Sequence, residues 1–504
     1  MTEIVRWLRH PRPVLRAALE VLNAANGVRP LGREGYVTLP VFAFGWPTTE
    51  VAPLYLGVSV LDAARRGLRG DFSGSRGRLA LGLTGVAWAL LGVIMYRDAR
   101  SDPPLDRALR EALGDDYAAV AAAGERRRRR PGVIATSLTR RRYVKRASTV
   151  RYGPHGRANF ADIWRRADLP ADGRAPVVLQ VPGGAWSIGM HRPQAYPLMS
   201  YLAERGWVCV SMAYRVSPAH TWPDHIVDVK RALAWIKEHI AEYGGDPDFV
   251  AITGGSAGGH LAALAALTPD DPQYQPGFTE ADTSVVAAVP LYGRYDWFTT
   301  TGAGRKEFIA FLQRLVVKKK FATHRQVYLD ASPITRVRAD APPFFVLHGT
   351  DDSIIPVTEG REFVEALRAV STAPVAYAEM PHAQHAFDFY GSPRAHFTAE
   401  AGRPEGTVRT GLFSFTCVHD DRDTALELAN TQLSRQYNQD FSKLVEKYTL
   451  AGNPEDCAAR LAEYVKAGAN AVMFSHGCPP EYVEENTTAI GETLLPLARQ
   501  LAAR

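Results

Sequence analysis

The sequence predicts an α/β fold: a doubly wound, mostly parallel sheet, with an apolar helical region before it and a smaller α/β segment after it. Three observations predict this organisation. Strand-like apolar runs alternate with helical patterns from about residue 148 to residue 400, a long uncharged run lies in the first 100 residues, and the strand–helix pattern returns in the last hundred. The chain has 504 residues, 46% of them hydrophobic, so it is too long for one ordinary domain and apolar enough for a sizeable core.

The first hundred residues predict attachment to a membrane. Leu79–Tyr96 is an uncharged run bracketed by Arg78 and Arg97, and as a helix it is just long enough to span a bilayer core. An earlier apolar stretch, Tyr36–Leu61, carries Glu50 and three prolines. That stretch is compatible with a second span, a kinked or re-entrant segment, or a helix on the membrane surface. The alternative for this whole region is a buried hairpin in a soluble domain.

The positive charge of the chain is concentrated in its first 150 residues, and the formal net charge is +6. Arginines flank both apolar runs on each side, so the positive-inside rule does not indicate which face of the membrane the rest of the chain occupies. No cleavable signal is visible in residues 1–35. Arg126–Arg130 and Arg140–Arg142 predict a basic, solvated linker over residues 101–147. Nucleic acid is not an expected partner, because no recognition motif accompanies this charge.

Six strands are expected in the central region, separated by helices. The clearest helix is Ile226–Tyr243, which has apolar residues at helical spacing and is ended by Gly244 and Gly245. Alternation of this kind favours a parallel sheet covered on both faces. The expected strands are Val177–Val181, Val208–Met212, Phe249–Thr253, Val285–Leu291, Phe344–Leu347 and Val375–Ala378.

Cysteines do not indicate a special chemistry. They are far apart in the sequence and form no CxxC pair, so they suggest no zinc site and require no oxidising compartment. Cys209 lies within an apolar strand-like run and is expected to be a small core residue. The other three are Cys417, Cys457 and Cys478.

A Gly-x-Ser-x-Gly motif centred on Ser256 carries the main functional signal. It follows the strand Phe249–Thr253 directly and precedes the apolar helix Leu261–Leu267. A serine hydroxyl is a weak nucleophile, and it must project from a tight strand-to-helix turn toward a base, where glycines remove Cβ clashes. The motif alone is weak, but it occurs once in this chain and its setting strengthens it. We therefore expect Ser256 to be a catalytic nucleophile.

An acid and a base follow Ser256 in the order that such a sheet requires. Asp352 follows the strand Phe344–Leu347 and is the expected acid, with Asp351 as the reserve. His385 comes after the next strand and is the expected base, with His382 as its competitor. A structural role is expected for His348, and a turn-forming role is the alternative for either aspartate.

Donors for an oxyanion are expected in the loop after Val177–Val181. Its small residues let backbone N–H groups approach a substrate oxygen, and the start of the following helix offers one more donor. An ordinary glycine turn is the alternative. The candidate donors are Gly183, Gly184, Ala185 and Ala257.

With these residues in place, residues 148–402 resemble hormone-sensitive-lipase-like esterases, close to the bacterial acetyl- and feruloyl-esterase type. The matching pieces are PGGAW, Tyr214-Arg215, GGSAGG, HGTDDSIIP and HAQHAFD. The resemblance implies an α/β-hydrolase fold and a serine carboxylesterase or lipase with a small-molecule ester substrate. It also implies Ser256, Asp352 and His385 as the triad and no metal or organic cofactor.

The same resemblance implies that Trp186 and Tyr214 contact the substrate. The chain departs from the family at one loop, where Pro182 and Ala185 replace the first and last residues of the usual His-Gly-Gly-Gly. The N-terminal region resembles that of membrane-associated actinobacterial lipase-type esterases, which implies a location at a bacterial cell membrane. We expect the hydrolase region to remain active without it.

The tail, residues 410–504, resembles the C-terminal end of luciferase-like flavin- or deazaflavin-dependent monooxygenases. Its expected strands are Leu412–Val418 and Ala471–Phe474, and its helices include Thr424–Gln436 and Pro454–Ala467, the latter capped by Asn453. Such a (β/α)-barrel fragment, with at most two strands, is expected to be catalytically silent. The pattern of the last expected hydrolase helix stops near residue 399, which predicts a fusion of two genes at this point. A non-catalytic binding protein and a flavin-dependent oxidoreductase are the alternative functions.

Overall fold

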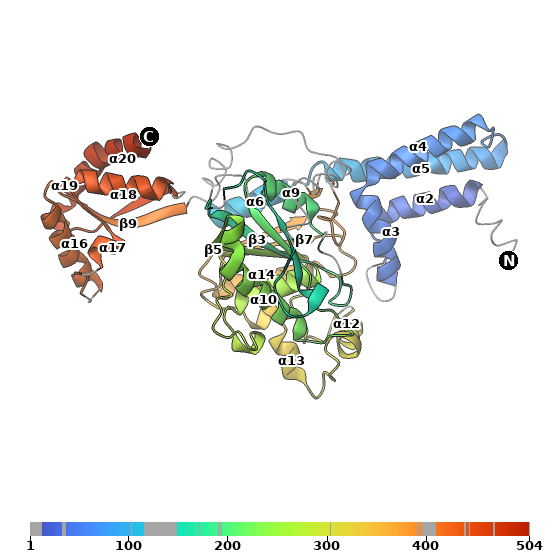
Figure 1. Ribbon diagram of the computed structural model, residues 1–504. Helices are drawn as coiled ribbons and strands as arrows, with labels where there is room; N and C mark the ends of the chain where they lie inside the picture. Colours follow the sequence, from blue (N-terminus) through green and yellow to red (C-terminus); the bar gives the residue numbers. More distant parts are fainter. Residues whose placement is uncertain are drawn as a thin grey trace. The chain divides into compact units, whose positions relative to one another are not determined.

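An eight-stranded sheet forms the centre of the larger of two compact units in the computed structural model. The first unit contains the N-terminal helices and this sheet, and the second contains the last hundred residues (Figure 1). The structure describes residues 13–32, 37–101, 103–114, 149–170, 172–189, 192, 194–302, 304–390, 392, 394–395, 410–437, 440–442, 444–466 and 469–502. Most of the basic linker, including Arg126–Arg130, and the segment around residue 399 lie outside these residues.

The sheet has the strand order β1-β2-β4-β3-β5-β6-β7-β8, and every neighbouring pair from β4 to β8 is parallel. The pairs β1–β2 and β2–β4 are antiparallel. All six predicted strands are present, and β1 and β2 extend the sheet beyond them. The strands are β1 (Thr149–Arg151), β2 (Phe160–Trp164), β3 (Ala175–Val181), β4 (Val208–Met212), β5 (Gly245–Gly255), β6 (Ala287–Leu291), β7 (Phe344–Gly349) and β8 (Val375–Met380).

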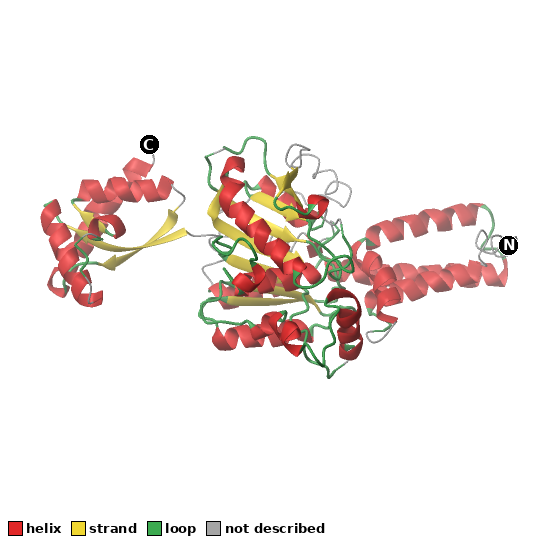
Figure 2. Cartoon of the chain, turned by 60° about the horizontal axis from the view of Figure 1, so that its bottom comes forward, coloured by secondary structure: helices red, strands yellow, loops and turns green. Residues whose placement is uncertain are grey.

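Helices cover both faces of the sheet (Figure 2). Val177 and Leu179 of β3 pack on one face, whereas Val178 packs on the other, as expected from the two-residue period of a strand. Helices α10, α11 and α14 cover the first face and α9 covers the second. The bounds are α9 (Tyr196–Glu204), α10 (Asp224–His239), α11 (Ala257–Leu267), α12 (Arg305–Phe311), α13 (Arg325–Asp330) and α14 (Thr358–Val370). This doubly wound, mostly parallel sheet confirms the α/β class predicted for the central region. Cys209 is buried in its core, as expected.

A helix from the expected linker belongs to this core. Helix α6 (Pro103–Leu113) buries Leu105, Ala108 and Leu109 against the β7 and β8 side chains Leu347 and Met380. It therefore covers part of the same sheet face as α9. A hydrolase boundary at residue 148 leaves out this helix, and a chain that began there would expose apolar surface beside β8.

The N-terminal apolar region forms helices α2 (Pro13–Val28), α3 (Thr38–Glu50), α4 (Ala52–Leu68) and α5 (Gly74–Asp98). Helix α5 contains the whole uncharged run and packs against α2 and α4 (Figure 1). The other apolar stretch is divided into α3 and α4 at Val51, whose backbone leaves the helical conformation (φ −125°, ψ 33°). Among the described residues, one segment, which begins with α5, is long and apolar enough to cross a membrane by length and composition.

The second unit contains a parallel sheet of three described strands in the order β10-β9-β11. The expectation of at most two strands is wrong, because β10 (Leu450–Gly452) is too short to show a two-residue pattern. Cys417 and Val418 are neighbours in β9 and pack in different clusters, so helices cover both faces. Asn453 accepts a hydrogen bond from the N–H of Asp456, as a helix cap should. The remaining elements are β9 (Thr410–Val418), α16 (Arg422–Tyr437), α17 (Val445–Tyr448), α18 (Pro454–Lys466), β11 (Ala469–His476), α19 (Val483–Thr488) and α20 (Leu495–Ala502).

Candidate active site

Ser256 lies in a sharp turn between β5 and α11. Its backbone has φ 58° and ψ −120°, a conformation that residues other than glycine rarely adopt. Its N–H donates to the carbonyl of Leu291 at 3.0 Å. The flanking glycines are required by close packing. A Cβ on Gly258 would lie 2.0 Å from the carbonyl oxygen of Val181, and one on Gly254 would lie 2.6 Å from the same oxygen. The turn therefore projects the hydroxyl of Ser256 from the carboxyl edge of the sheet.

Asp352 and His385 form a buried pair at the same edge. The Oδ2 of Asp352 lies 2.6 Å from the Nδ1 of His385, and the two side chains are 0% and 7% exposed. The other carboxylate oxygen, Oδ1, accepts the N–H groups of Ile354 and Ile355, each at 2.8 Å. Both oxygens are thus used, and the carboxylate fixes the orientation of the imidazole.

The same surroundings hold Asp352 ionised. Burial by itself raises the pKa of Asp352, but the charge of His385 and hydrogen bonds from His348 and His385 outweigh burial and keep this pKa below its ordinary value. The Nε2 of His348 lies 2.9 Å from the carbonyl oxygen of Ile355 and 3.5 Å from Asp352. This contact is the structural role expected for His348.

The two reserve candidates pair with each other. The Nδ1 of His382 lies 3.3 Å from the Oδ2 of Asp351, and the side chain of His382 is 45% exposed. The sequence thus places two aspartate–histidine pairs side by side, one buried and one at the surface. Only the pair of Asp352 and His385 combines a short contact with burial.

Tyr292, which the motifs do not mark, connects the two halves of the site. Its ring lies edge-on to His385 with centroids 4.7 Å apart, and its hydroxyl would lie 2.4 Å from a Cβ on Gly255, the residue before Ser256. The hydroxyl donates to the carboxylate of Asp388, which also lies close to His385 in the chain. No hydrogen bond joins Ser256 to His385 among the described contacts.

The oxyanion loop lies beside Ser256, but one expected donor is already used. A Cβ on Gly183 would lie 3.3 Å from the Cβ of Ser256. The N–H of Gly183 donates to the side-chain oxygen of Gln194 at 2.7 Å, so the expectation that Gly183 donates to an oxyanion is wrong. The N–H groups of Gly184, Ala185 and Ala257 bind no other described residue.

Trp186 and Tyr214 are buried beneath this loop and contact it or the core through hydrogen bonds. They are 3% and 5% exposed, so little of either side chain is accessible to a substrate, and the expectation that they contact one stays a prediction. The indole N–H of Trp186 donates to His260 at 3.2 Å, and its carbonyl oxygen lies 3.1 Å from a ring nitrogen of His225. The hydroxyl of Tyr214 donates to the carbonyl of Pro182 at 3.0 Å. These contacts hold Ala185 and Trp186, whose φ angles are 50° and 57°, in a conformation that is strained for non-glycine residues.

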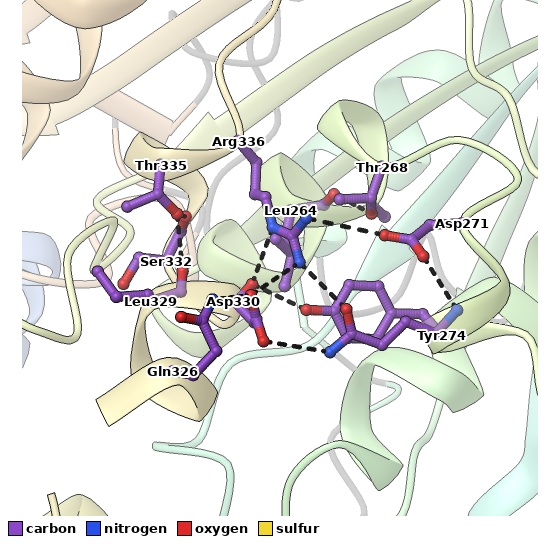
Figure 3. Close-up of polar contacts among 12 residues, drawn as sticks. Leu264, Thr268, Asp271, Tyr274, Gln326, Leu329, Asp330, Ser332, Thr335 and Arg336 are labelled. Carbon is purple, nitrogen blue, oxygen red and sulfur yellow. Dashed lines mark hydrogen bonds and ion pairs between the residues drawn. The ribbon is translucent and has the colours of Figure 1, made fainter. Parts of the chain in front are cut away.

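The buried histidines behind the loop are neutral. Burial lowers the pKa of both His225 and His260 to about 3. The other ring nitrogen of His260 lies 2.7 Å from the carbonyl oxygen of Ala331. Ala331 follows Asp330, whose carboxylate pairs with Arg336 and whose carbonyl oxygen accepts the hydroxyl of Tyr274 (Figure 3). His260 therefore connects α11 both to Trp186 and to this segment.

The N-terminal helix α3 lies against the loop that carries His385. The ring of Phe42 meets His385 edge-on at 5.7 Å, and the indole N–H of Trp46 donates to the carbonyl of Ala386 at 2.8 Å. More than 300 residues separate these partners, so no local pattern predicts the contact. Among the described residues, no group of three or more histidine, cysteine or acidic side chains could hold a metal ion.

Comparison with known proteins connects this geometry to esterases. A family model described as BD-FAE matches residues 162–367. The chain is 48% identical over 411 residues to a probable carboxylic ester hydrolase, LipM of Mycobacterium tuberculosis, covering 79% of this chain and 93% of that protein. It is 48% identical to the esterase LipQ of the same organism, covering 64% of this chain and 76% of LipQ.

More distant similarity extends to a plant protein and a solved structure. The isoprenylcysteine α-carbonyl methylesterase ICME of Arabidopsis thaliana is 31% identical, covering 44% of this chain and 52% of ICME. The thermophilic esterase Est2 of Thermogutta terrifontis is 26% identical with a TM-score of 0.43, covering 50% of this chain and 87% of that structure.

Proposed function

This chain belongs to the carboxylic ester hydrolase family of α/β hydrolases and is an ester hydrolase, and we propose that it acts through a triad of Ser256, His385 and Asp352. The observation that carries the proposal is the buried 2.6 Å contact between Asp352 and His385, at the sheet edge where Ser256 projects. A histidine oriented in this way can accept the proton of a serine hydroxyl.

The reaction proceeds through an acyl-enzyme. The Oγ of Ser256 attacks the carbonyl carbon of the ester while the Nε2 of His385 accepts the hydroxyl proton. The oxyanion is held by the N–H groups of Gly184, Ala185 and Ala257. The bond to the alcohol then breaks, and His385 returns the proton to the alcohol oxygen. Water, activated by His385, attacks the acyl carbon and releases the carboxylic acid.

Alanine substitutions test the triad by hydrolysis of p-nitrophenyl acetate. Ser256→Ala and His385→Ala should each lower kcat/KM by about 10³-fold or more, because the nucleophile and its base act as one unit. His382→Ala is the matched control, since its imidazole pairs with Asp351 at the surface, and it should retain activity. Full activity in Ser256→Ala, or an inactive His382→Ala beside an active His385→Ala, would refute the assignment.

The N-terminal helices are proposed to insert into a membrane. Of the 21 large apolar side chains that are exposed among the described residues, 19 lie between residues 13 and 113. Exposed apolar surface of that extent is unfavourable in water and favourable in lipid. The expected location is therefore a membrane, with lipid in contact with the outer surfaces of α2, α4 and α5.

The second unit is proposed to be a catalytically silent remnant of a luciferase-like (β/α) barrel. The support is the sequence resemblance together with the three parallel strands among its described residues, which are too few to close a barrel. Such a unit contributes no flavin or deazaflavin site to the reaction, and the ester hydrolysis takes place in the first unit alone.

A further inference from the structure

Helix α3 contacts the loop that carries His385 through two aromatic side chains that lie one helical turn apart. Phe42 and Trp46 stack on each other at 5.3 Å with their planes 10° apart, so they form one continuous aromatic surface. Phe42 presents this surface to the ring of His385, and Trp46 donates its N–H to the next residue, Ala386.

The loop held in this way needs external support. Ala386 has a φ of 62°, which is costly for a residue with a Cβ. The ring of Trp46 also packs against Phe389 at 5.4 Å and Tyr390 at 5.0 Å. The loop from His385 to Tyr390 thus contacts α3 along most of its length, through one hydrogen bond and several aromatic faces.

The C-terminal end of α3 is fixed to the same part of the hydrolase by buried polar groups. Glu50 pairs with Arg394 at 2.7 Å and accepts a hydrogen bond from the hydroxyl of Ser392 at 2.7 Å. Arg394 also pairs with Asp98 at the end of α5. Removal of one partner from such a buried pair leaves an unpaired charge, so these contacts favour the docked position of α3.

We propose that α3 is part of the active site: Trp46 is a positioning residue for His385, and Phe42 forms the wall beside it. The proposal rests on the proposed triad and adds that the N-terminal helices do more than attach the enzyme to lipid. Ester hydrolysis requires α3 to be docked, because the imidazole of His385 must reach both Asp352 and the hydroxyl of Ser256. A displacement of about 1 Å at such a group can cost as much as 100-fold in rate.

The test compares two tryptophan substitutions in the full chain in detergent micelles. Trp46→Phe keeps an aromatic ring and removes the N–H that binds Ala386. Trp88→Phe is the matched control, because its N–H donates to Ser59 within the N-terminal helices at 2.9 Å. Activity is expressed per serine titrated with a fluorophosphonate, so that unfolded protein does not contribute.

Trp46→Phe should lower kcat for p-nitrophenyl acetate by about 10-fold, with KM little changed, while Trp88→Phe retains the kcat of the unsubstituted chain. A kcat per titrated serine equal to that of the unsubstituted chain would overturn the proposal. A purely structural role for Trp46 would lower the amount of titratable serine and leave this kcat unchanged, which also counts against it.

A second pair of variants covers the case in which Trp46→Phe does not fold. Phe42→Leu should lower kcat, whereas Phe44→Leu should not, because Phe44 is 66% exposed and lines a cavity of about 660 Å³ among α2–α5. Equal kcat values in the two variants would refute the role of Phe42. Failure of the triad is recognised separately, since Ser256→Ala would then keep its activity.

Discussion

At the residue scale, the proposed catalytic residues contact side chains that lie far away in the sequence. The motif around Ser256 and the order of Asp352 and His385 identify the candidate triad, because each follows a strand that can be predicted locally. The contact of Gly183 with Gln194 and the burial of Trp186 could not be predicted. Both depend on how the oxyanion loop folds back on the core, and local spacing does not encode this.

His260 gives a prediction for the pH dependence of stability at this scale. Burial lowers its pKa from 6.5 to about 3. Between these values the unfolded chain binds a proton that the folded chain lacks, so the free energy of unfolding falls as the pH falls from 6.5 toward 3. His260→Gln should remove about one proton, about 1.4 kcal/mol per pH unit, from the slope of this free energy against pH. Urea denaturation at several pH values between about 4 and 6 measures the slope, and equal slopes would contradict the prediction.

At the scale of elements, the period of apolar residues predicts the strands β3 to β8 and the helices α10 and α11. It fails where an element is short or where its role depends on distant partners. Strand β10 has only three residues, and α6 lies in a stretch whose arginines predict a solvated linker. The apolar face of α6 is needed because the β7–β8 part of the sheet would otherwise be uncovered.

The N-terminal helices are expected to attach the full chain to membranes. The full chain should sediment with membranes and resist extraction with carbonate. Val86→Asp puts a charge at mid-helix in α5, where it costs about 3 kcal/mol in lipid, and it should increase the soluble fraction. Val370→Asp is the matched control, because Val370 is 47% exposed on α14 and Val86 is 49% exposed. A full chain that stays in the supernatant without detergent would refute the membrane proposal.

At the scale of the whole molecule, two compact units share one chain, and the proposed triad lies in the first. Family membership excludes the alternative of a non-catalytic binding protein on the same fold. The expectation that the hydrolase region is active without the N-terminal residues stays a prediction, and the contacts of α6 and α3 weigh against it. Removal of residues 1–148 removes both α6 from the core and α3 from the proposed active site.

The second unit is expected to contribute neither to ester hydrolysis nor to flavin binding. A chain stopped near residue 405 should keep its kcat per titrated serine within about 2-fold, because the described residues of the triad and its supports all precede that point. The full chain should also bind no flavin when titrated with flavin mononucleotide in a calorimeter. Tight flavin binding, or loss of kcat in the shortened chain, would show that the second unit takes part in function.

The most direct measurement of the central claim is the mass of the peptide that a fluorophosphonate modifies. The full chain is treated with the reagent, digested and analysed by mass spectrometry, with His385→Ala treated in parallel. We predict one adduct per chain on Ser256, and strongly slowed labelling in His385→Ala, because the hydroxyl then lacks its base. An unmodified Ser256 in a preparation whose ester hydrolysis the reagent has abolished, with the adduct on another residue, would contradict the account.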